Sequence, residues 1–291
     1  MTQPPPVYEE DGGSESSYSE SEIYSQDDDS SFSSASIQQS STGSCSLDSI
    51  GRMLEQLEVD DPSLTELLID IKRTDKEAAK FISQLLPTNT HVQQIRILSG
   101  TTPSHRQKFL KVISGLEKNT SIKHIEIQDA DINREMASWL LPMFAHCQTL
   151  QHIGMVNCNF IGAAVSILFV ALQHNKHIRH LTFRACDWEE HNTDTIASSI
   201  PFLNLHSLTL DGINIAEDTW PFLLNQIAHC TDIILLDLSR NELYAANTHL
   251  LTKCLTAQKS ISTLVLTDCC LDEKCMKVRV DIIYMLTKHW G

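Results

Sequence analysis

One apolar pattern recurs eight times along the chain at an almost constant interval. It is clearest in "DIILLDLSRNEL", residues 232–243, where Ile233, Leu236 and Leu238 hold positions one, four and six. The first positions of the eight units are Leu64, Val92, Ile122, Leu150, Ile178, Leu205, Ile233 and Ile261, at intervals of 28, 30, 28, 28, 27, 28 and 28 residues. Repeats of this length predict a solenoid, because one unit cannot bury its own apolar face and must stack on its neighbours.

Each unit combines a short strand with a helix. Apolar residues alternate at the start of a unit and then recur every three or four residues, as in "FIGAAVSILFVALQHN" at 160–175. The first pattern is typical of a strand and the second of a helix. The chain is therefore predicted to form an α/β solenoid of about eight 28-residue strand–helix units, with a parallel sheet on the concave face and helices outside.

The repeats do not fill the chain. Residues 1–46 are rich in serine and acidic residues and cannot bury enough apolar surface to fold, so we expect a disordered tail. The expected repeat domain is 47–291, with repeats over 64–272. A one-sided apolar helix within 47–63 suits an N-terminal cap, and 273–291 suits a closing helix at the other end.

The spacing L-x-x-L-x-L-x-x-N-x-L, found at 233–243, is the signature of leucine-rich repeats. A 28-residue strand–helix unit resembles the ribonuclease-inhibitor-like class of these repeats, which implies a horseshoe-shaped solenoid. The stretches "DDPSLTELLI" (60–69), "TNTHVQQIRI" (88–97) and "KNTSIKHIEI" (118–127) are also similar to the repeat domain of the tropomodulin and leiomodin family. This narrower resemblance implies regulation of actin and the cytoskeleton, which we keep as an alternative function with actin as a less favoured partner.

Charge and cysteine content indicate which classes of partner and which cellular compartment to expect. The net charge is −15, and residues 1–50 hold ten acidic residues and no Lys or Arg. Because the chain has no basic stripe, neither nucleic acid nor an anionic membrane is an expected partner. We see no signal peptide and no apolar stretch long enough to span a membrane. Nine scattered cysteines indicate reduced thiols, so we expect a cytoplasmic, or alternatively nuclear, protein.

No motif predicts catalysis, a cofactor or a metal site. Dinucleotide, Walker, nucleophile-elbow and H-E-x-x-H patterns are absent, and "CCLDEKC" (269–275) lacks the paired C-x-x-C spacing of a zinc site. Position nine of a unit holds Asn241 in the clearest repeat and Cys158, Cys186 and Cys269 in three others. The leucine-rich-repeat class accepts cysteine in place of asparagine there, so these thiols are expected to be structural and the protein non-enzymatic.

The candidate binding residues lie on the predicted strands. Positions three, five and seven point away from the core, so they should line the concave surface and contact a protein partner. The residues selected are Arg96, His124, Glu126, His152, His180, Arg184, Asp211 and Asp237. The three histidines share position three of consecutive strands, roughly 5 Å apart. Either they titrate near neutral pH and make binding pH-sensitive, or they are solvated polar residues on an open face. Exposed imidazoles without orienting partners are poorly organised for a metal.

A second binding motif lies in the tail. Pro5, Pro6 and Tyr8 form P-P-x-Y, an extended ligand that WW domains hold in aromatic-lined grooves. The alternative function that follows is an adaptor that recruits WW-domain proteins. The preferred hypothesis is a non-enzymatic scaffold or regulator that binds a protein partner on its concave repeat face.

Overall fold

A computed structural model describes residues 47–100, 102–188, 192–243 and 245–269. The predicted tail at 1–46, including the P-P-x-Y motif, lies outside the described residues. The predicted closing helix at 273–291 and the last residues of the predicted repeats lie outside them too. All statements below concern the described part of the chain.

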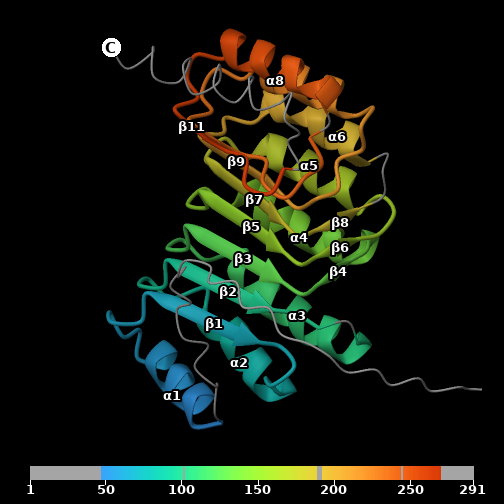
Figure 1. Ribbon diagram of the computed structural model, residues 1–291. Helices are drawn as coiled ribbons and strands as arrows, with labels where there is room; N and C mark the ends of the chain where they lie inside the picture. Colours follow the sequence, from blue (N-terminus) through green and yellow to red (C-terminus); the bar gives the residue numbers. More distant parts are fainter. Residues whose placement is uncertain (1–46, 101, 189–191, 244, 270–291) are drawn as a thin grey trace, which may run out of the picture. The chain divides into compact units, whose positions relative to one another are not determined.

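Eight parallel strands form one open sheet in chain order (Figure 1). They are β1 (Glu66–Asp70), β2 (Gln94–Leu98), β3 (His124–Gln128), β5 (His152–Val156), β7 (His180–Arg184), β9 (Ser207–Asp211), β10 (Leu235–Asp237) and β11 (Thr263–Val265). Equivalent positions of the repeat pair directly, as for His124 with His152 and His152 with His180. The predicted α/β solenoid with a parallel sheet is confirmed.

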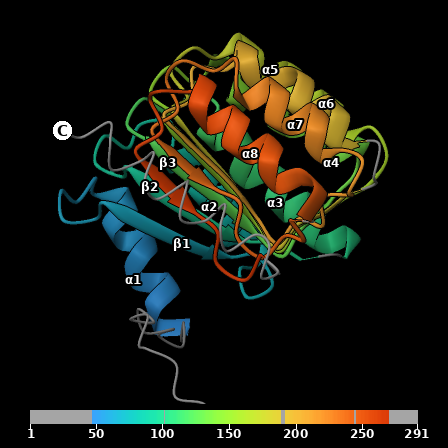
Figure 2. The ribbon, with the colours of Figure 1, turned by 45° about the horizontal axis from the view of Figure 1, so that its top comes forward.

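A helix leads from each strand to the next, and these helices cover one face of the sheet (Figure 2). They are α2 (Lys76–Leu85), α3 (Pro103–Leu116), α4 (Arg134–His146), α5 (Ala164–His174), α6 (Asn192–Ser199) with the short 3-10 turn η1 (Ile200–Phe202), α7 (Trp220–Ile227) and α8 (Ala245–Ala257). Side-chain oxygens of Asp75, Thr102 and Asn133 cap the first turns of α2, α3 and α4. The first helix, α1 (Leu47–Glu58), packs beside α2 at the start of the sheet.

The chain leaves most strands through a left-handed residue at position eight. The residues with this backbone conformation are Asp129, Asn157, Ala185, Gly212, Arg240 and Asp268, with φ between 49° and 64°. The N–H group of each of the first five donates to a carbonyl of the following unit, as from Asp129 to Val156 at 3.1 Å. Three short strands follow three of these turns and form a second parallel sheet: β4 (Asp131–Ile132), β6 (Asn159–Phe160) and β8 (Asp187–Trp188). Each turn is therefore held by its neighbour.

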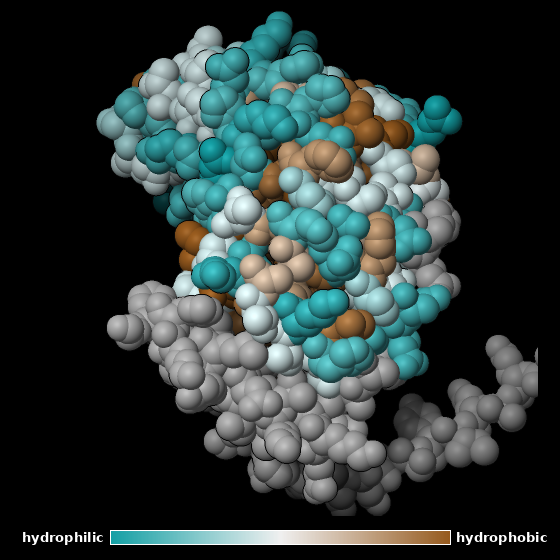
Figure 3. Space-filling model, turned by 90° about the horizontal axis from the view of Figure 1, so that it is seen from above, coloured by the Kyte–Doolittle hydropathy of each residue, from teal (hydrophilic) through white to brown (hydrophobic). Residues whose placement is uncertain are grey.

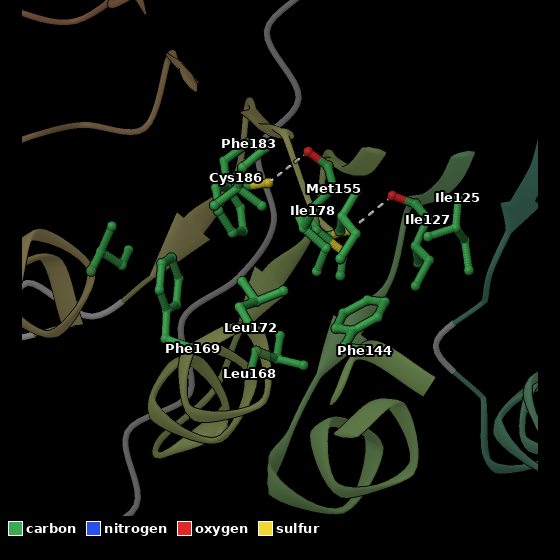
Figure 4. Close-up of a cluster of buried hydrophobic side chains, with 14 of the residues drawn as sticks. Ile125, Ile127, Phe144, Met155, Leu168, Phe169, Leu172, Ile178, Phe183 and Cys186 are labelled. Atoms are coloured by element: carbon green, nitrogen blue, oxygen red, sulfur yellow. Dashed lines mark hydrogen bonds between the residues drawn. The ribbon is translucent and has the colours of Figure 1, made fainter. Parts of the chain in front are cut away.

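The core lies between the sheet and the helices. In Figure 4, Ile125 and Ile127 of β3, Met155 of β5 and Phe183 of β7 point toward the helices, where Phe144 of α4 and Leu168 and Phe169 of α5 meet them. The apolar positions four and six are fully buried in the clearest repeat, where Leu236 and Leu238 have no exposed surface. Positions three, five and seven must then face away from the helices, because side chains alternate along a strand.

Candidate interaction surface

We call the sheet surface opposite the helices the strand face. It consists of the side chains at positions three, five and seven of the eight strands, and no described helix covers it. The structure places all eight selected residues on it, in β2, β3, β5, β7, β9 and β10. Arg96 and Arg184 are exposed, Asp211 is buried, and the others are partly exposed. Their role in partner binding stays a prediction.

Imidazole rings stack along the centre of this face. The rings of His124 and His152 are parallel, with centroids 4.0 Å apart and an interplanar angle of 2°. His180 continues the row at 5.6 Å from His152. The row then extends to His206, whose ring meets His180 edge-on at 6.4 Å. We call these four residues the histidine row.

The position of His206 was not predicted. It holds position two of its unit, directly before β9, whereas the other three histidines hold position three. The unit that precedes it has 27 residues, from Ile178 to Leu205, so the next strand begins one residue early. Sequence reasoning missed His206 because it assigned only positions three, five and seven to the concave surface.

Burial lowers the pKa values of His124, His152 and His180. Desolvation lowers the pKa of His152 to about 4, and the positive charges that His124 and His180 would carry lower it further. Desolvation also lowers the pKa of His124 and of His180. The stack buries Nε2 of His124 without a hydrogen-bond partner, which adds to the cost of charging that ring. His124, His152 and His180 therefore gain protons at a lower pH than exposed imidazoles do.

Acid should consequently destabilise the fold. Between about pH 6.5 and pH 4 the unfolded chain binds a proton at residue 152 that the folded chain does not, so the free energy of unfolding falls as the pH falls through this window. The expected loss is up to about 3 kcal/mol from this residue. Urea unfolding of full-length His152→Gln at pH 4.5 to 7 should show a shallower pH dependence than the unchanged protein. The exposed His146→Gln on α4 serves as the control, and equal slopes for both variants would contradict the assignment.

Two ion-pair clusters flank the histidine row. On one side, Nε of Arg96 lies 2.8 Å from a carboxylate oxygen of Glu126, which also accepts a hydrogen bond from Gln128. The Glu126 side chain lies over Gly154, where a β-carbon would come within 3.2 Å of it. The absence of a side chain at Gly154 thus leaves room for the Glu126 carboxylate beside it.

On the other side, the buried Asp211 carboxylate binds two guanidinium groups. Nε of Arg184 lies 2.9 Å from one oxygen, and Arg240 donates to both oxygens at 2.6 and 2.8 Å. Hydrogen bonding to Asp211 raises the pKa of Arg240, and Asp237 and Asp268 face the same group. Sequence reasoning missed Arg240 because it lies in the turn at position eight, beyond the strand.

In four units, position nine carries an asparagine or a cysteine under the turn: Cys158, Cys186, Asn241 and Cys269. The Asn241 amide donates to the carbonyls of Leu210, Leu238 and Ser239 at 2.6 to 3.1 Å and accepts from the N–H of Ile213 at 2.9 Å. In three other units, a cysteine thiol at position nine donates hydrogen bonds in place of the amide.

The thiols of Cys158, Cys186 and Cys269 each donate to a carbonyl of the preceding unit, at 3.3 to 3.4 Å. All three cysteines are buried and unbridged. A hydrogen bond with the Cys186 thiol, and then burial, raise the pKa of the Cys158 thiol. The structural role expected for these cysteines is confirmed. A strand, a turn held by an asparagine or cysteine ladder, and a helix thus recur in one stack. The chain has a leucine-rich-repeat fold.

A comparison with curated proteins finds sequence similarity to a leucine-rich-repeat protein. A human protein named NACHT, LRR and PYD domains-containing protein 13 is 26% identical over 166 residues. The match covers 54% of this chain but only 16% of that protein, so the chain spans about a sixth of this curated relative. No family model matches the sequence.

Two solved structures also match much of the chain. The tropomodulin C-terminal domain of Caenorhabditis elegans is 10% identical, with a TM-score of 0.36, and the match covers 81% of this chain and 98% of that domain. A leiomodin-1 structure of actin-binding site 2 is 12% identical, with a TM-score of 0.30. The match covers 84% of this chain and 98% of that chain. Likeness at this level does not indicate what the leucine-rich-repeat chain binds.

The rest of the described surface is mixed in character. Seen from above, it is mostly hydrophilic with small hydrophobic spots (Figure 3). Large exposed apolar side chains outside the strand face are spread over several elements: Val59, Ile161, Val170, Phe202, Phe222 and Ile234. Singly exposed apolar residues are normal and mark no interface. In the described ranges, no cluster of three or more His, Cys, Asp or Glu could hold a metal ion, and no helix could cross a membrane.

Proposed function

We propose that this leucine-rich-repeat protein is a non-enzymatic interaction scaffold or regulator that binds a protein partner through its strand face. The observation that supports this most is the order of that face. Polar side chains from consecutive strands are held by the histidine row and by two ion-pair clusters. A surface ordered before binding loses little side-chain entropy when it meets a partner.

The strand face also leaves groups available to a partner. The side chains of Arg96 and Arg184 are 53% and 48% exposed although each is paired with a carboxylate. Leu68 on β1 is 41% exposed and supplies an apolar contact at the start of the sheet. Arginines positioned by carboxylates can bind a partner while their geometry stays fixed, as is common at the energetic centres of interfaces.

A variant that changes two strand-face residues tests this proposal. Full-length His152→Gln/Arg184→Gln should lose captured partners, and its affinity for any partner so identified should fall about tenfold or more. The matched control, Arg134→Gln/His146→Gln, changes the same residue types on exposed positions of α4, on the helix side. Partner affinity that is equal in the two double variants would exclude the strand face as the binding surface.

Two alternatives are separated by direct assays. The resemblance to tropomodulin makes actin the alternative partner, so actin filaments should be sedimented with the full-length protein and with both double variants. Recruitment of a WW domain through Pro5, Pro6 and Tyr8 is the other alternative. Partner capture that is lost in Tyr8→Ala but retained in the strand-face variant would favour it.

A further inference from the structure

Two cations on the border of the strand face have no carboxylate partner. Lys123 and Arg179 come directly before His124 and His180, at the edge where the strands begin. The Lys123 ammonium donates to the Gln93 side chain at 3.2 Å, and Arg179 donates to a backbone carbonyl at 2.9 Å. Neither forms an ion pair with any described residue.

The paired arginines elsewhere on this surface make the contrast clear. Arg96, Arg184 and Arg240 each bind a carboxylate of a neighbouring unit. The protein thus neutralises its guanidinium groups at both flanks of the strand face but not along the edge beside the histidine row. An unneutralised border of this kind attracts negative charge from outside the fold.

His152 and His180 differ from His124 in the charged groups around them. His124 faces Glu126 and Glu66 as well as Arg96. His152 faces His124 and His180, and the hydroxyl of Thr182 lies 3.4 Å from its Nε2. His180 faces His206 and His124. No described carboxylate forms a hydrogen bond with the imidazole nitrogens of His152 or His180, although Glu126 lies over the neighbouring Gly154.

We propose that a strip formed by Lys123, His152, Arg179, His180 and His206 binds an acidic segment of the protein partner. This inference rests on the proposed function, since it assigns the chemistry of a partner to the same strand face. Carboxylates of the segment would accept hydrogen bonds from imidazole N–H groups and pair with the two cations at the edge. The strip is the part of the face whose charge no described residue complements.

Binding of this kind is coupled to protons. A carboxylate docked beside His152 and His180 favours their protonated forms and so raises their pKa values. The complex then takes up protons that the unbound protein does not hold, and the affinity increases as the pH falls from 7.5 to 5.5. Glutamate side chains stay ionised over this range, so the change would report the histidines.

An acidic protein segment fits the strip better than a nucleic acid does. Nucleic-acid binding requires several Lys and Arg side chains on phosphates. The strip supplies two, and the same strand face carries Glu66, Glu126 and Asp237, which would repel a long polyanion. A short run of carboxylates can match the strip without crossing these residues.

Binding of labelled hexaglutamate to the full-length protein tests the inference, with hexaglutamine as the uncharged probe. Fluorescence anisotropy should show hexaglutamate binding that is about fivefold tighter at pH 5.5 than at pH 7.5. Lys123→Gln/Arg179→Gln should weaken it about fivefold at both pH values. His152→Gln/His180→Gln should remove most of the pH dependence. Lys80→Gln/Lys111→Gln, which removes two exposed cations from α2 and α3, should leave binding unchanged.

The outcomes separate this inference from the proposed function. Absent hexaglutamate binding, or binding weakened equally by the α2/α3 control variant, overturns the strip while partner capture still decides the strand face. If a single-stranded RNA oligonucleotide bound the strip and hexaglutamate did not, the acidic-peptide assignment would be wrong. Thermal unfolding of each variant, with an unchanged midpoint, shows that lost binding is not lost folding.

Discussion

Asn241→Ala is expected to lower the free energy of unfolding by about 3 kcal/mol. The amide of Asn241 is 2% exposed and donates to carbonyls of Leu210, Leu238 and Ser239, while its oxygen accepts from the N–H of Ile213. Alanine supplies none of these bonds, and several buried backbone groups would be left without partners. Equilibrium unfolding in urea, monitored by circular dichroism, measures the loss.

Two further substitutions make this prediction specific. Asn241→Cys should cost only about 1 kcal/mol, because the thiols of Cys158 and Cys186 donate to carbonyls from the same ladder position. Asn225→Ala removes an exposed asparagine from α7 and should change stability by less than about 0.5 kcal/mol. A loss in Asn241→Ala no larger than that of Asn225→Ala would show that the ladder does not hold the turns.

The repeat frame could be read from the sequence because it rests on local periodicity. Positions four and six had to be buried for the units to stack, and Leu236 and Leu238 are. A small side chain at position nine can form hydrogen bonds with the backbone of the turn, which explains both Asn241 and the three cysteines there. The same frame placed Arg96, His152 and Arg184 on the strand face, since alternation along a strand leaves no other direction.

The pairings on the strand face could not be read in the same way. Arg184 and Arg240 bind Asp211 from units 27 and 29 residues away, and side-chain rotamers decide such contacts. Strand spacing predicts rings roughly 5 Å apart, yet His124 and His152 stack at 4.0 Å while His180 stands 5.6 Å further on. The pKa of His152 is lowered by its burial in that stack, which the sequence alone does not reveal. Composition therefore indicated titratable groups but not the pH at which they titrate.

The first two units of the solenoid lack the ladder residue, and the turn of the first unit is held in another way. Position nine holds Lys72 in the first unit and Gly100 in the second. Instead, Lys108 of α3 reaches the turn that follows β1, where its ammonium donates to the carbonyls of Ile71 and Thr74. The lysine is 7% exposed and forms no ion pair with a described carboxylate. A buried cation of this kind is rare in a helix and is retained here by the two carbonyls it satisfies.

Lys108→Met should therefore destabilise the protein by about 2 to 3 kcal/mol. Methionine keeps the length and apolar stem of the side chain but leaves the buried carbonyls of Ile71 and Thr74 without a donor. Removing a buried charge is itself favourable, so the loss is smaller than two full desolvation penalties. Lys111→Met, at an exposed position of the same helix, should stay within about 0.5 kcal/mol of the unchanged protein. If Lys108→Met proved as stable as Lys111→Met in urea unfolding, relief of the buried charge would outweigh the two hydrogen bonds, and the first turn would not depend on them.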